Sequence, residues 1–60
     1  MTLAQIVAAW GRDALYAAQQ EARIADDFDG IPDPFFRELS LSHRATSLAL
    51  LAYHHRGMNP

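Results

Sequence analysis

Residues 2–28 have the sequence TLAQIVAAWGRDALYAAQQEARIADDF, which contains no proline and consists mainly of strong helix formers. Apolar side chains recur along it at alternating spacings of four and three residues, and one carboxylate interrupts the series. These positions are Leu3, Val7, Trp10, Ala14, Ala17, Glu21, Ile24 and Phe28. The stretch therefore predicts one continuous amphipathic helix over residues 2–28, whose apolar stripe has to be covered by another helix.

Local signals agree with these bounds. Thr2 and Gln5 have the spacing of a capping box, in which each side chain bonds a free backbone N–H of the first turn. Residues 29–33 form an acidic turn that contains Gly30 and a proline. Asp33 followed by Pro34 is a favourable N-cap and first helical residue, so a second helix is predicted to begin there.

The second helix is predicted over residues 34–56. Ser40 and Ser42 are both plausible N-caps, which leaves open a break of this helix near residues 39–42. Gly57 is the expected residue just beyond its end. Within this helix a mainly apolar set shares one face, while Leu50 points the opposite way. The set is Leu41, Ala45, Leu48, Leu51 and Ala52.

Two helices joined by a short turn form an antiparallel hairpin, so the fold is predicted to be all-α. In this register Glu21 lies beside residues 41–44, and Trp10 lies near Tyr53. A charged residue on an apolar stripe needs a partner. Arg44 is the favoured ion-pair partner of Glu21, and a hydrogen bond to His43 is the alternative.

Sixty residues without a cysteine form a single small domain over residues 1–60 that rarely buries a complete core. A lone hairpin would leave several large side chains in water, namely Trp10, Phe28, Phe35, Phe36 and Leu50. Exposed apolar area of this kind marks an association surface. We therefore expect a homodimer that forms a four-helix bundle, with an obligate hetero-complex as the alternative.

The residues expected at the interface with a second copy or a partner combine the apolar stripe, the hairpin tip and the Glu21 pair. They are Val7, Trp10, Ala14, Glu21, Ile24, Phe28, Phe35, Phe36, Arg44 and Leu48. A second, exposed contact surface is expected on the polar face of the first helix. It consists of Arg12, Tyr16 and Arg23.

Catalytic, cofactor and metal sites are not predicted. Glu21 has no second carboxylate or nucleophile in evidence, as acid–base chemistry would require. His54 and His55 are neighbours on a helix and diverge by about 100°. The segment from Asp27 to Gly30 suggests a calcium loop, but Ala25 and Phe36 would occupy its first and last ligand positions.

The chain has five arginines, no lysine and a net charge of −2, without any block of basic residues. Protein binding is therefore favoured over nucleic-acid binding. We expect a non-catalytic binding module, such as an adaptor, inhibitor or assembly factor of the size that phages and mobile elements often encode. A dimeric nucleic-acid-binding regulator that uses the arginines is the alternative.

The location expected from the sequence is the cytoplasm. No basic segment precedes an apolar run at the N-terminus, so no signal peptide is predicted. The longest uncharged stretches, residues 1–11 and 46–53, are too short to cross a bilayer.

Overall fold

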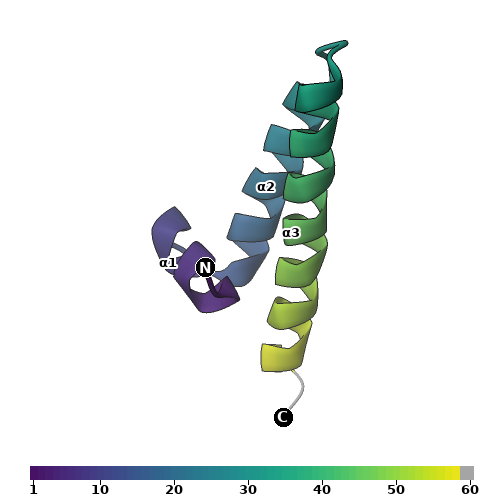
Figure 1. Ribbon diagram of the computed structural model, residues 1–60. Helices are drawn as coiled ribbons and strands as arrows, with labels where there is room; N and C mark the ends of the chain where they lie inside the picture. Colours follow the sequence, from purple (N-terminus) through teal and green to yellow (C-terminus); the bar gives the residue numbers. More distant parts are fainter. Residues whose placement is uncertain (59–60) are drawn as a thin grey trace.

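The computed structural model describes residues 1–58 and contains three helices, which confirms the all-α prediction. α1 spans Leu3–Trp10, α2 spans Ala14–Asp29 and α3 spans Pro34–Met58. α2 and α3 lie side by side and run in opposite directions, while α1 sits against them near the start of α2 (Figure 1). The result is an elongated molecule with extents of 42 × 19 × 17 Å.

The prediction of one continuous helix over residues 2–28 is wrong, because the chain turns at Gly11. This glycine has a φ of 78°, and its N–H donates to the carbonyls of Val7 and Ala8. A left-handed glycine is a common helix terminator. Asp13 then caps α2 by accepting a hydrogen bond from the backbone N–H of Tyr16 at 2.8 Å. The capping box of Thr2 and Gln5 at the start of α1 is confirmed.

The break that the sequence left open near residues 39–42 does not occur. α3 is continuous from Pro34 to Met58, so neither Ser40 nor Ser42 begins a new helix. Gly57 lies within α3 and does not end it. The predicted start is confirmed, because the Asp33 carboxylate accepts a hydrogen bond from the backbone N–H of Phe35 at 2.8 Å.

Small residues of α2 form most of the core against α3. Ala17, Ala18 and Ala25 are almost fully buried. Short side chains let two helix backbones approach closely. From α3, Leu50 enters this core with an exposed fraction of 0%, and the partly buried Leu51 packs against it.

The orientation predicted for α3 is therefore wrong for all of its inner set except Leu51, which packs against the core as expected. Leu50 was expected in water, yet it is buried, together with the polar side chains of Ser40 and Ser47. Leu41 and Leu48, expected on the inner face, are 62% and 64% exposed. Polar side chains can face inward here because each of them donates a hydrogen bond to an acceptor on α2. Ser47, for example, donates to the carbonyl of Ala18 at 2.7 Å.

The turn at Gly11 folds α1 back over the hairpin. Leu3, Ile6, Val7 and Trp10 pack at the edge of the core. Trp10 consequently lies near Ser42 and Thr46, rather than near Tyr53 as a continuous helix predicted. In the described part of the chain, none of the three helices has the length and apolar character needed to cross a membrane.

Candidate functional site

Glu21 is the centre of a polar cluster that joins all three helices. Its side chain belongs to α2, and the residue is only 8% exposed. One carboxylate oxygen, Oε1, lies 2.6 Å from Nδ1 of His43 on α3. The other, Oε2, accepts a hydrogen bond from Nε1 of Trp10 on α1 at 3.1 Å. The charge of this carboxylate is thus stabilised by two donors in a place where water has little access.

The prediction of Arg44 as the favoured partner of Glu21 is wrong, whereas the alternative, a hydrogen bond to His43, is confirmed. Neighbouring residues on a helix diverge by about 100°, so only one of His43 and Arg44 can face α2 at this level. Arg44 instead bonds Asp26 at 3.0 Å and Asp29 at 2.7 Å. The predicted register is nevertheless confirmed, because Glu21 lies beside residues 41–44.

The Arg44 ion pairs form a second, more exposed network near the turn. A hydrogen bond from Ser40, and then the nearby Arg44 guanidinium, lower the pKa of Asp29 below its ordinary value of 3.8. The two carboxylates, with Asp26 contributing most, raise the pKa of Arg44. Both effects favour the charged forms and link the end of α2 to the first turns of α3.

A hollow of about 470 Å³ lies beside the Glu21 cluster, between α1 and α3. Its wall combines apolar side chains of α1 with polar residues of α3. The residues that line it are Met1, Ile6, Ala9, Trp10, Glu21, Ser42, His43 and Thr46. Here the carboxylate fixes the orientation of an imidazole that remains partly accessible, since 32% of the His43 side chain is exposed.

This pair has the chemistry of a positioned hydrogen-bonding group. A carboxylate at Nδ1 sets the tautomer of a histidine and leaves its second nitrogen to meet another group. Acid–base catalysis also needs a substrate held within reach and a group that reacts. Both oxygens of Glu21 already bond side chains of this chain, so its evident role is to join α1 to the hairpin.

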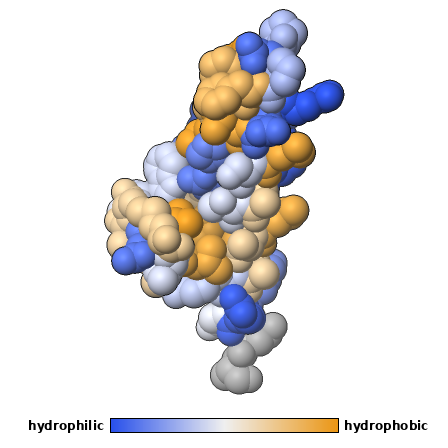
Figure 2. Space-filling view, viewed as in Figure 1, coloured by the Kyte–Doolittle hydropathy of each residue, from blue (hydrophilic) through white to orange (hydrophobic). Residues whose placement is uncertain are grey.

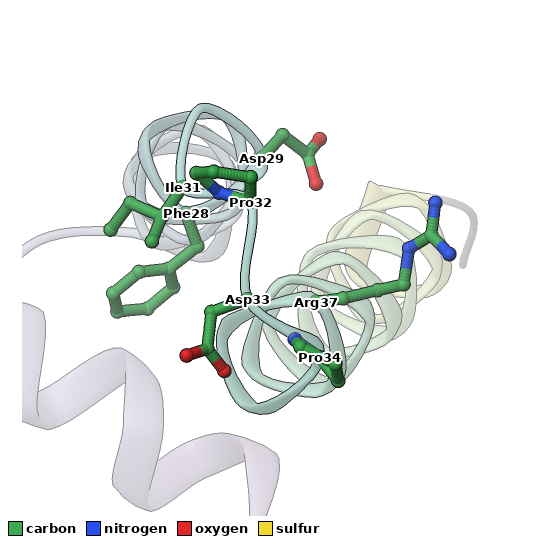
Figure 3. A pocket seen from close by; sticks show the side chains of 7 residues that line it. All are labelled: Phe28, Asp29, Ile31, Pro32, Asp33, Pro34 and Arg37. Atoms are coloured by element: carbon green, nitrogen blue, oxygen red, sulfur yellow. The ribbon is translucent and has the colours of Figure 1, made fainter.

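A second hollow, of about 430 Å³, lies at the hairpin tip. Asp29 and Arg37 project on one side of the turn, whereas Phe28 and Ile31 project on the other (Figure 3). A carboxylate and a guanidinium therefore project on the same side of the turn. The arrangement resembles a charge-compensated turn rather than a site for an ion of either sign. Among residues 1–58, no group of three or more histidine, aspartate or glutamate side chains is placed to hold a metal ion.

Most residues expected at an interface are occupied within the chain itself. Ala14 and Glu21 are buried, and a larger group is partly buried: Val7, Trp10, Ile24, Phe28, Phe36 and Arg44. Phe28 packs on Phe36, with ring centroids 5.6 Å apart. Of the ten residues expected at the interface, Phe35 and Leu48 are the two that are exposed to solvent, each by 64%.

The surface predicted around Tyr16 is assembled only in part. The Arg12 guanidinium lies 4.8 Å from the centre of the Tyr16 ring, in a cation–π contact. The edge of the same ring meets Trp10, with centroids 6.5 Å apart. Arg23 is exposed farther along α2.

The largest feature that sequence reasoning missed is an apolar outer face on α3. It consists of four exposed residues, Leu41, Ala45, Leu48 and Ala52, which we call the outer stripe. Figure 2 shows hydrophobic side chains projecting from α3 on the side away from α2. The sequence shows that these residues share one face of the helix, but it predicted that this face packs against the first helix.

Comparison with known proteins adds no relative, since no protein-family model, curated protein or solved structure matches this chain. Functional inference therefore rests on the surface and the packing described above.

Proposed function

We propose that this chain is a small, non-catalytic protein-binding module that acts as a helical dimer, in the manner of an adaptor, inhibitor or assembly factor. The observation that carries the proposal is the outer stripe. Leu41 and Leu48 are 62% and 64% exposed on a helix whose inner face carries serines and a histidine. A water-exposed helix face that carries two large apolar side chains is expected where a second protein surface covers it.

The energetics favour self-association through this face. Burying one leucine side chain stabilises a protein by about 1.5–3 kcal/mol. A symmetric dimer buries Leu41 and Leu48 of both copies, so each contribution is made twice. Among residues 1–57, whose burial is described, five apolar residues are buried, and four of them are alanines. A dimer would supply the apolar burial that a chain of this size lacks.

Light scattering after size exclusion tests the dimer. The wild-type chain should have twice the mass of one chain at micromolar concentration. The double variant Leu41→Ser/Leu48→Ser should be monomeric and retain its helical circular dichroism. Phe35→Ser is the matched control, because Phe35 belongs to the same helix and is as exposed as Leu48 but lies off the stripe. A wild-type monomer, or a dimer that the double variant preserves, would contradict the proposal.

Binding of another protein is tested against the nucleic-acid alternative. Duplex DNA should bind the dimer negligibly at physiological salt, because Arg44 is already paired with two aspartates. Affinity for DNA that falls steeply with rising salt would support the alternative and overturn the proposal. Capture of a host protein by the wild-type dimer, measured again after Arg12→Ala/Arg23→Ala, would show whether the Tyr16 surface takes part.

A further inference from the structure

The outer stripe belongs to a longer pattern on α3 that is symmetric about its own middle. Glu38 precedes it by three residues and His55 follows it by three, so the spacings are three, four, three, four and three. This is the a/d spacing of a coiled coil. All six side chains are exposed, and none forms an ion pair or side-chain hydrogen bond with another of residues 1–58.

We propose that a second copy packs its α3 antiparallel against this face, with the two-fold axis passing midway between Ala45 and Leu48. This inference rests on the proposed dimer and specifies its geometry. A two-fold axis places residues equally distant from it opposite each other. Ala45 then faces Leu48 of the second copy, and Leu41 faces Ala52 of the second copy.

Size complementarity follows at every apolar layer. Each of the four layers contains one leucine and one alanine, so the layers have equal volume and the helices can approach closely over their whole length. A parallel pair would instead place Leu48 against Leu48 and Ala45 against Ala45. In that arrangement the leucine layers would be overpacked and the alanine layers would leave voids, and both defects weaken the packing.

Charge complementarity selects the same arrangement. At each end of the antiparallel seam, Glu38 of one copy faces His55 of the other, a carboxylate opposite a hydrogen-bond donor. In a parallel pair Glu38 would face Glu38. Arg44 flanks the seam near the axis, but its charge is already balanced by Asp26 and Asp29 within each copy. The two arginines therefore add little repulsion across the axis.

Engineered cysteines distinguish the two orientations, since the natural chain has none. The variants Glu38→Cys and His55→Cys, each alone in its chain, are mixed in a glutathione redox buffer, and the disulfides are identified by mass spectrometry. The antiparallel dimer predicts that the ratio of the mixed 38–55 product to the 38–38 and 55–55 products together exceeds its statistical value of one by about tenfold. Dominant 38–38 and 55–55 products would overturn the antiparallel register while leaving the dimer itself standing.

A charge exchange tests the end layers in the otherwise intact chain. Glu38→Lys should raise the dimer dissociation constant about tenfold, and adding His55→Glu in the same chain should restore it to within about threefold. Equal and additive weakening by the two changes would overturn the pairing of Glu38 with His55. A chain that is monomeric at all concentrations would overturn the proposed dimer as well, so the two failures are distinguishable.

Discussion

The two faces of α3 differ in how their side chains are satisfied: the inner face mixes leucines with hydrogen-bonded polar groups, and the outer face leaves its leucines in water. The inner face, against α2, carries Ser40, His43 and Ser47 around a single buried leucine. The outer face carries two leucines that are more than half exposed. Polarity alone therefore does not decide which face of a helix is buried. Polar side chains that all find partners can form an inner face, and an apolar face can be kept for another protein.

The largest effect should separate two leucines of the same helix. Leu50→Ala empties a fully buried site and should lower the free energy of unfolding by about 3 kcal/mol. Leu48→Ala should lower it by less than about 0.5 kcal/mol at concentrations where the chain is monomeric. Urea titration followed by circular dichroism measures both variants. Similar losses at the two positions would mean that the faces of α3 are wrongly assigned.

The next effect tests the polar inner face through Glu21. Glu21→Leu should lower the free energy of unfolding by about 2 kcal/mol, because Trp10 Nε1 and His43 Nδ1 lose their acceptor in a buried place. Glu21→Gln retains an oxygen acceptor and should lose less. Thermal unfolding compares the two variants. Stabilisation by leucine would show that the cluster does not hold α1 to the hairpin.

A smaller effect is expected from the serine that bonds the α2 backbone. Ser47→Ala removes the hydrogen bond to the carbonyl of Ala18 and should cost about 1 kcal/mol of unfolding free energy. Ser42→Ala, an exposed position on the same helix, is the control and should change stability by less than about 0.5 kcal/mol. The same urea titration measures both. A loss at Ser42 as large as that at Ser47 would remove the distinction between bonded and unbonded serines.

The smallest effect concerns acid stability. Because Ser40 and Arg44 hold the pKa of Asp29 below 3.8 in the folded chain, its carboxylate stabilises the fold above that pH. This contribution is lost as the pH falls through the lowered pKa and Asp29 takes up a proton. Asp29→Asn should therefore flatten the decline of the melting temperature below about pH 4. Asp27→Asn, at an exposed carboxylate of the same helix, should leave that decline unchanged.

Signals confined to one turn of chain were predictable from the sequence. The capping box at Thr2 and the helix start at Asp33 depend on neighbouring residues only, and both are confirmed. The approximate register of Glu21 also followed from the lengths of the two helices and the turn. Gly11 was misjudged because its flanks favour helix strongly, although Asp13 two residues later is a good N-cap.

The orientation of α3 depended on interactions that no local pattern contains. Counting apolar residues places Leu41 and Leu48 inward, which is the ordinary outcome for a helix with one apolar face. The actual choice depends on whether α2 offers acceptors to Ser47 and His43, and this requires the packed structure. The packed structure was also needed to predict the partners of Arg44. The sequence favoured Glu21, whereas Arg44 pairs with Asp26 and Asp29.

The most direct test of the orientation of α3 is an isotope-filtered methyl NOE measurement on a mixture of labelled and unlabelled chains. The Leu48 methyl groups should show contacts between copies, to the Ala45 methyl group, and none to α2. The Leu50 methyl groups should show contacts only within one chain, to Ala17 and Ala18. Contacts of Leu48 with α2 inside a single chain, with Leu50 free of them, would contradict a polar inner face and an apolar outer stripe.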